Sequence, residues 1–304
     1  MSQQHSHSYL EASARERLQH LLDPGSFEEW LPPSSRVMSP HLAQLDAPVA
    51  FDDGVAVGRA RIDGRIVLVA AQEGGFMGGA VGEVHGAKLV GMLQRAILER
   101  PQAVLLLLET GGVRLHEANA GLIAVSEVMR AVLAVRAAKV PVIVLIGGSN
   151  GCFGGMGIVA RCANMILMSE EGRLAMSGPE VIETASGVEE FDSRDRALVW
   201  RTTGGKQRYL LGDCQGIVAE SIQAFRTAAV AAIDTCRTLP VALSLAALEA
   251  EQTLLRERVA RFGDCADPLA IWALLGVENP ERLPMLEADV FQAAVAGYRL
   301  GVPA

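Results

Sequence analysis

Two glycine-rich segments are the part of this sequence best suited to chemistry. The first is Thr110-Gly111-Gly112-Val113-Arg114, and the second runs from Gly147 to Met156 as GGSNGCFGGM. Glycine adopts positive φ readily and leaves main-chain NH groups open to a ligand. Two such turns placed together can surround one substrate oxygen with NH donors as negative charge develops on it. These segments therefore predict an oxyanion hole.

The predicted donors are four main-chain amides, two from each turn. Gly112 and Val113 supply them in the first turn, and Gly154 and Gly155 supply them in the second, at the start of a predicted helix. A helix N-terminus adds positive potential to such a site. The alternative is that these glycines only permit tight turns and close packing of helices.

Nucleophilic chemistry is a second possibility for these segments. The residues around Ser149 match G-x-S-x-G, but hydrolases with that motif carry their histidine after the serine. Phe153 stands where a dinucleotide-binding variant of this loop needs glycine, so nicotinamide binding is not expected. His116 and Glu117 remain as acid–base candidates or as a structural pair that caps the next helix. All six histidines precede Ser149, at His5, His7, His20, His41, His85 and His116.

Composition excludes several classes of function. The chain has 304 residues, of which 50% are hydrophobic and 20% charged, enough to bury a large core. Its net charge of -8, with acids and bases mixed, leaves no basic stripe, so we expect no nucleic-acid partner. Charge or glycine interrupts every apolar stretch before the roughly 20 residues that span a bilayer. We therefore expect no membrane association and a cytoplasmic location.

The five cysteines give no sign of a metal or disulfide framework. They are widely spaced, and no C-x-x-C occurs among them. We expect them to act as small buried hydrophobic side chains, and we expect no metal site. They are Cys152, Cys162, Cys214, Cys236 and Cys265.

The elements that must position the two turns follow an alternating pattern. A hairpin signal, Asp63-Gly64, separates predicted strands at 55–62 and 66–71, and a glycine-rich loop at 74–82 leads into a helix at 83–100. Alternation of strands and helices then predicts an α/β fold in which each glycine turn follows a strand. The predicted order is strand 104–108, helix 119–139, strand 142–146, helix 155–161 and strand 165–168. Further helices are predicted at 10–22, 177–184, 197–203, 220–239, 250–262 and 268–275.

The order of motifs over about residues 12–238 resembles the carboxyltransferase family of the crotonase superfamily. Thr110 stands where the family usually has serine and Val113 where it usually has alanine. No cysteine zinc ribbon precedes the domain, and no second carboxyltransferase half follows it. Within the family the chain most resembles the beta subunits of malonate decarboxylases. The motifs are ARERL at 14–18, LLDPGSF at 21–27, Gly78-Gly79, Gly82-Glu83 with Lys88, ETGGVR at 109–114 with Glu117, Gly154-Gly155, GPEVIE at 178–183, GVEEFD at 187–192 and GDCQGIV at 212–218.

This resemblance implies a crotonase-like spiral of strand-strand-helix repeats. We expect it to form a domain at 9–280, followed by an extension at 281–304, and the polar residues at 1–8 predict a mobile tail. The resemblance implies catalysis by the amides of Gly112, Val113, Gly154 and Gly155. It also implies substrate binding by Gly78, Gly79, Gly111, Arg114 and Met156.

The resemblance further implies partners and a carrier. A gamma subunit would supply a second crotonase-like half. An acyl-carrier subunit would present the malonyl thioester on a phosphoribosyl-dephospho-CoA arm, and no cofactor would bind this chain itself. The expected products are acetyl thioester and carbon dioxide. Two alternatives stay open, namely a carboxyltransferase that passes the carboxyl group to or from biotin, and a structural subunit whose partner performs the chemistry.

Overall fold

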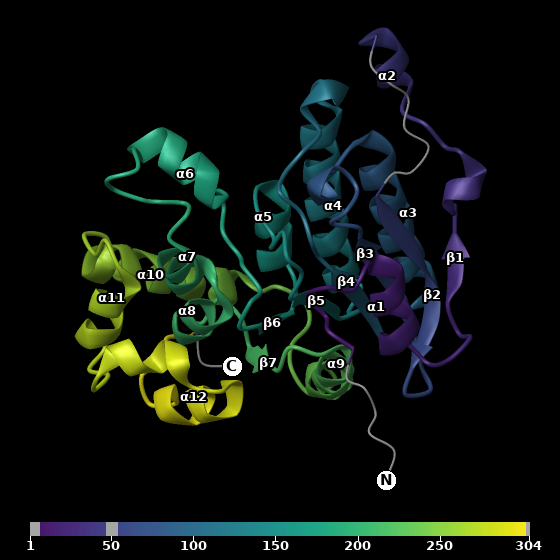
Figure 1. The fold of residues 1–304 in the computed structure, drawn as a ribbon. Coiled ribbons are helices and arrows are strands. Elements are labelled where there is room, and N and C mark those ends of the chain that lie inside the picture. The colour runs from purple at the N-terminus through teal and green to yellow at the C-terminus, as the bar shows by residue number, and fades with distance from the viewer. Residues whose placement is uncertain (1–6, 47–53, 302–304) are drawn as a thin grey trace.

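The computed structural model describes residues 7–46 and 54–301, and its centre is a seven-stranded sheet (Figure 1). The strands lie in the sheet in the same order as in the sequence. The first three pair antiparallel, and each later strand pairs in parallel with the one before it. The strands are β1 (Glu28–Trp30), β2 (Val55–Ile62), β3 (Arg65–Gln72), β4 (Ala103–Leu107), β5 (Val142–Ile146), β6 (Met165–Ser169) and β7 (Gly216–Val218).

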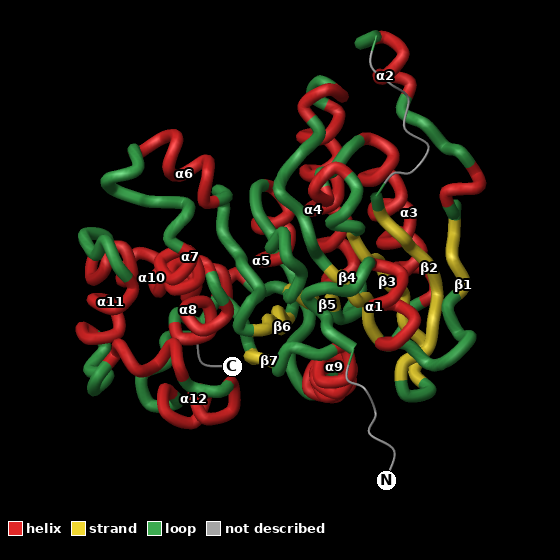
Figure 2. The backbone as a smooth tube through the Cα atoms, in the orientation of Figure 1, coloured by secondary structure: helices red, strands yellow, loops and turns green. Residues whose placement is uncertain are grey.

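Helices cover both faces of this sheet (Figures 1 and 2). One face packs against α3 (Glu83–Glu99), α4 (Ala120–Ala137) and α5 (Gly155–Arg161). The other packs against α1 (Ala14–Leu21) and α9 (Ile222–Cys236). Successive side chains of a strand point to opposite faces, so the central strands are apolar throughout and contribute alternate residues to the two cores.

The predicted alternation of strands and helices is confirmed, with most element ends displaced by one to five residues. The Asp63-Gly64 turn joins β2 to β3 in register, with Ile62 opposite Arg65. The predictions did not include β1, β7 or several short helices. The remaining helices are α2 (Pro40–Gln44), α6 (Pro179–Ser186), α7 (Arg196–Thr203), α8 (Gly205–Leu210), α10 (Leu245–Phe262), α11 (Pro268–Leu274) and α12 (Ala288–Val295), with 3-10 turns at Pro33–Ser35, Met77–Gly79, Leu115–Glu117 and Pro280–Met285.

The two chain ends of the described structure are attached to this body. Residues 1–6 of the expected tail lie outside the described residues, whereas the carbonyl of His7 accepts a hydrogen bond from the Ile222 NH at 2.9 Å. At the other end, α12 buries Phe291 and Val295 in a third apolar cluster that contains Trp272 and Leu210. The segment at 281–304 thus packs on the preceding helices through part of its length.

A buried ion pair fixes α1 against the carboxyl end of β4. The guanidinium of Arg17 binds the carboxylate of Glu109, and the exposed fractions of these two side chains are 2% and 5%. Arg17 Nε also donates to the carbonyl of Tyr9 at 2.8 Å, and the guanidinium lies 4.6 Å from the Tyr9 ring centre. The second glycine turn contacts the same carboxylate, because the Asn150 NH donates to it at 3.1 Å.

Arg17→Met is expected to destabilise the protein by about 3 to 5 kcal/mol, because it leaves the Glu109 charge buried without its partner. The double variant Arg17→Met/Glu109→Gln is expected to lose less, since no unpaired charge remains. Arg15→Met is the matched control, because Arg15 lies on α1 as Arg17 does and pairs with Glu29 of β1, but its side chain is 49% exposed. That control is expected to cost at most about 1 kcal/mol. Urea denaturation measures all three, and a loss for Arg17→Met no greater than for Arg15→Met would contradict the role of the pair.

Candidate functional site

The first glycine turn is held by the loop that precedes α3. Val81 forms a parallel bridge with Val113. In this bridge the Val81 NH donates to the Gly112 carbonyl at 2.9 Å, and the Arg114 NH donates to the Val81 carbonyl at 3.0 Å. The bridge therefore uses the Gly112 carbonyl and the Arg114 NH, which flank Val113, and it directs the Val113 NH away from Val81.

The first turn lies between the second turn and the loop that precedes α3. Thr110 and Cys152 form a parallel bridge, and the Phe153 NH donates to the Thr110 carbonyl at 2.9 Å. A Cβ atom built on Gly154 would lie 3.4 Å from the Cα of Gly112. The structure thus brings together the two turns that the sequence analysis singled out. They meet beyond the carboxyl ends of β4 and β5.

Of the four predicted donors, two already make a hydrogen bond within the protein and two do not. The Gly112 NH donates to Thr110 Oγ1 at 3.1 Å, and the Gly154 NH donates to the Met176 carbonyl at 2.9 Å. The NH of Gly155, the first residue of α5, has no partner within its helix. Within residues 7–46 and 54–301, neither the Gly155 NH nor the Val113 NH makes a hydrogen bond.

Close packing explains why several of these positions hold glycine. A Cβ atom at Gly155 would lie 2.4 Å from Cγ1 of Val125 on α4. A Cβ atom at Gly79 would lie 1.9 Å from the carbonyl oxygen of Glu109. These glycines allow α5 and the loop before α3 to approach the turns closely. Gly112 differs, because its φ of +148° requires glycine although nothing lies within 4 Å of its Cβ position.

The residues predicted to bind substrate lie around these turns. The Gly78 carbonyl accepts from the Gly111 NH at 2.9 Å, so these two glycines join the loop before α3 to the first turn, next to Gly79. Met156 is buried in α5. The buried guanidinium of Arg114 binds Glu117 at 3.1 Å and donates to the Ala80 carbonyl at 3.1 Å. Their roles toward substrate stay predictions.

Ionisable and nucleophilic side chains near the turns are engaged with the protein. Ser149 Oγ donates to the Glu109 carboxylate at 3.2 Å. The Glu117 carboxylate accepts from the Glu83 NH at 2.7 Å, so it caps the preceding helix α3 rather than the helix that follows it. Cys152 is fully buried, and burial raises the pKa of its thiol far above the usual range. The thiol is therefore protonated at neutral pH and is a poor nucleophile.

Two arginines near the site were not singled out from the sequence. Arg17 anchors the Glu109 carboxylate beneath the second turn, and Arg173 donates to the Ser149 carbonyl. The hydrophobic pattern of an amphipathic helix does not show that one of its arginines is buried. Only the motif at residues 14–18 therefore marked the position of Arg17. Nothing in the local sequence marked Arg173.

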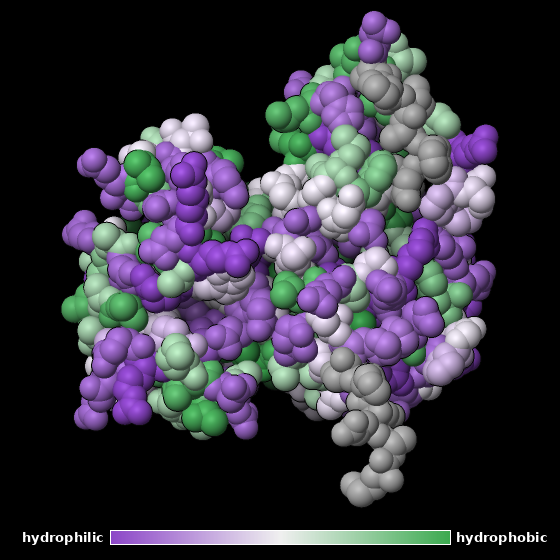
Figure 3. Space-filling view, viewed as in Figure 1, coloured by the Kyte–Doolittle hydropathy of each residue, from purple (hydrophilic) through white to green (hydrophobic). Residues whose placement is uncertain are grey.

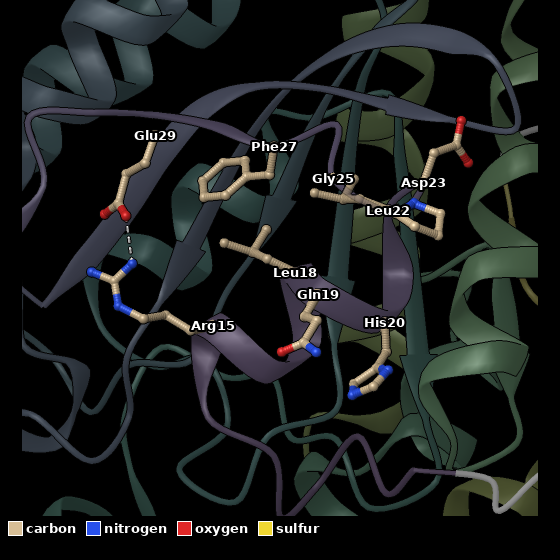
Figure 4. A pocket seen from close by; sticks show the side chains of 10 residues that line it. Arg15, Leu18, Gln19, His20, Leu22, Asp23, Gly25, Phe27 and Glu29 are labelled. Carbon is tan, nitrogen blue, oxygen red and sulfur yellow. Dashed lines mark hydrogen bonds and ion pairs between the residues drawn. The ribbon is translucent and has the colours of Figure 1, made fainter.

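A cavity of about 500 Å³ lies beside α1, and none of its lining residues belongs to the glycine turns. In Figure 4, Arg15 and Glu29 are joined on one side of this cavity, and Phe27 and Leu18 lie near them.

No group of three or more His, Cys, Asp or Glu side chains in the described part of the chain is arranged to hold a metal ion. Among the same residues, no helix is long and apolar enough to cross a membrane.

Comparisons with known proteins agree with this architecture. Residues 6–203 match the carboxyl transferase domain family. The malonyl-S-ACP:biotin-protein carboxyltransferase MADC of Malonomonas rubra is 43% identical, over 94% of this chain and 95% of that protein. In a crystal structure of a Pseudomonas malonate decarboxylase hetero-tetramer in complex with malonate, one chain is 39% identical. The match has a TM-score of 0.78 and covers 89% of this chain and 98% of that one.

A more distant solved structure shares the fold over part of its length. The transcarboxylase 12S hexamer with methylmalonyl-coenzyme A bound matches with 27% identity and a TM-score of 0.60, over 71% of this chain and 40% of that chain. These matches confirm the expected α/β, crotonase-like fold. The matched residues cover most of the chain and include β1 to β6 and both glycine turns. The chain therefore belongs to the carboxyl transferase family.

Proposed function

We propose that this chain is the beta subunit of a malonate decarboxylase and that it decarboxylates a malonyl thioester held on an acyl-carrier subunit. One observation carries the proposal. The amides of Val113 and Gly155 are the two predicted donors that make no hydrogen bond in the described residues, and they belong to turns that the Thr110–Cys152 bridge joins directly. The overall match to a malonate decarboxylase chain supports the choice of reaction.

In the proposed reaction the two amides bind the thioester carbonyl oxygen. The bond between the malonyl methylene carbon and its carboxyl carbon breaks, and carbon dioxide leaves. The electron pair of that bond forms an enolate whose negative charge lies largely on the thioester oxygen. Fixed NH donors lower the energy of this charge as it develops, because they need no reorganisation. A proton then adds to the methylene carbon and yields the acetyl thioester.

A partner subunit is the second part of the proposal. Several large apolar side chains on α4, on α6 and in the segments before them are 59% to 85% exposed in this chain, which indicates a surface that another protein covers. The outline of the molecule is hollowed between α6 and the side that carries α4 and α2 (Figures 1 and 3). We assign this face to the gamma subunit, as the second crotonase-like half. The exposed residues are Leu115, Leu122, Ile123, Met176 and Val181.

The substrate is a thioester rather than free malonate. A thioester carbonyl can accept the electron pair as an enolate, whereas a free malonate carboxylate gives no comparable electron sink and carries charge that is costly to bury. The proposal therefore includes the acyl-carrier subunit and its phosphoribosyl-dephospho-CoA arm as the source of the malonyl group. This chain supplies the oxyanion donors and itself carries no cofactor.

Carboxyl transfer to biotin is the second candidate function. It is favoured by the 43% identity to a relative named as a malonyl-S-ACP:biotin-protein carboxyltransferase. The same oxyanion donors serve both reactions, because both pass through the enolate of the acetyl thioester. The difference is the fate of the carboxyl group, which is released in one case and captured by a carrier-bound biotin in the other.

Loss of the Gly155 NH is expected to lower turnover by about a hundredfold to a thousandfold. Proline at this first helical position removes the NH and suits helix geometry. Val125→Ala makes room for the new side chain, because Val125 is the group that a Cβ at Gly155 would strike. The test compares Val125→Ala/Gly155→Pro with Val125→Ala/Gly155→Ala, which carries a Cβ but keeps the NH. Equal turnover of the two double variants in assembled complexes would refute the donor assignment.

Ser149→Ala and Cys152→Ala are each expected to keep substantial decarboxylase activity. Ser149 has no histidine partner in the described structure, and burial raises the pKa of the Cys152 thiol. Intact-mass spectrometry of the complex, quenched during turnover with malonyl carrier, should find no acyl group on this chain. Detection of an acyl adduct at either residue would contradict this prediction.

The complex of this chain with its partner and malonyl-loaded carrier is expected to release carbon dioxide without added biotin. Avidin is expected to have no effect on the rate, and the isolated chain is expected to be inactive toward free malonate. Labelled carbon dioxide release measures each case. Inhibition by avidin would instead support carboxyl transfer to biotin. Full activity in complexes that lack the Gly155 NH would instead support a purely structural role for this subunit.

A further inference from the structure

Arg173 lies along the outer edge of the second glycine turn. Its carbonyl accepts a hydrogen bond from the Cys152 NH at 2.7 Å, and its guanidinium donates to the Ser149 carbonyl. The next residue, Leu174, forms a parallel bridge with Cys152. The main chain therefore fixes Arg173 at the same end of the sheet as the free amides of the turns.

Aromatic rings hold the guanidinium of Arg173 in place. It lies 5.6 Å from the ring centre of Phe153 and 5.4 Å from that of Trp200 on α7. A second guanidinium, that of Arg196, lies 5.9 Å from the same Trp200 ring. Trp200 is itself anchored, because its indole NH donates to the Glu171 carbonyl at 3.2 Å. Two positive charges thus share one aromatic platform beside the second turn.

Neither arginine has a carboxylate partner within ion-pair distance in the described residues. Arg173 Nε is buried there and has no hydrogen-bond partner. Burial lowers the pKa of the Arg173 guanidinium from its usual value, the charge of Arg196 adds to this change, and the charges of Glu180 and Glu109 oppose it. Arg173 is half-buried and Arg196 is exposed, and a half-buried cation beside another cation, without a bonded anion, is less stable than one with an anionic partner. An arriving anion would supply that partner.

We propose that Arg173, supported by Arg196, binds an oxyanion carried by the substrate. The guanidinium presents its NH groups in a planar fork that matches a carboxylate or a phosphate. The inference rests on the proposed function, which offers two sources for such a group. One is the carboxylate of the malonyl thioester, and the other is a phosphate of the carrier arm. Arg173 would thereby select the substrate, whereas Val113 and Gly155 stabilise the reacting oxygen.

Binding to the assembled complex, measured by calorimetry, tests this role and identifies the source. One pair of probes is sulfoacetyl-pantetheine and acetyl-pantetheine, because the sulfonate replaces the malonyl carboxylate but cannot be lost. The other pair is 4′-phosphopantetheine and pantetheine. Arg173→Gln is expected to weaken binding of the anionic member of at least one pair about ten- to hundredfold and to leave the neutral member unchanged. Arg173→Lys is expected to give an intermediate loss, because it keeps the charge without the fork.

The pair that responds identifies the anion as the carboxylate or the phosphate. Arg261→Gln is the matched control. The Arg261 guanidinium also lies over an aromatic ring, 4.8 Å from the ring centre of Phe262, but both residues belong to α10 and not to the segments that form the turns. This control is expected to change neither pair. Unchanged binding of both anionic probes, or equal weakening of neutral and anionic members, in Arg173→Gln would overturn the proposal. Carbon dioxide release by the unmodified complex tests the proposed function separately.

Discussion

The carboxylate of Glu109 is the group on which the geometry of the site depends. It lies at the end of β4, it is buried, and it binds Arg17 from α1 together with the Asn150 NH of the second turn. Its size also determines the glycine pattern, because Cβ atoms at Gly148 and Gly74 would lie 2.3 and 2.5 Å from Glu109 side-chain atoms. These two glycines thus allow the loops to enclose the carboxylate. Arg17 in turn compensates a negative charge that would oppose the enolate of the proposed reaction.

The same packing leaves few amides for catalysis. Glycine-rich loops have many NH groups, but bridges between neighbouring loops use most of them, and each such bond makes the loop more rigid. The Val113 NH stays open because its residue is the central member of the bridge to Val81. The Gly155 NH stays open because it begins a helix. Both amides are consequently held by bonds that their neighbours make, which is the preorganisation that the proposed electrostatic catalysis needs.

The sequence was sufficient to predict β2 to β6, the helices between them and the two turns, because apolar strands followed by glycine give a strong local signal. It could not identify β1 and β7, which have three residues each and depend on pairing with a neighbouring strand. Nor could it separate the free amides from the engaged ones. The Gly154 NH is engaged by Met176, which lies 22 residues further along the chain, and only the folded structure brings the two together.

The ionisable groups nearest the turns determine how the chemistry is divided. Glu109 and Glu117 both accept main-chain NH bonds and both bind arginine, so several partners hold each carboxylate in place. Both carboxylates thereby shape the loops around the turns. In the proposed reaction the chain supplies charge stabilisation, and we infer that the proton for the enolate comes from water or from the partner subunit. If this chain supplies the amide donors and the proton comes from outside it, a site with fixed donors beside an exposed apolar surface is what the reaction requires.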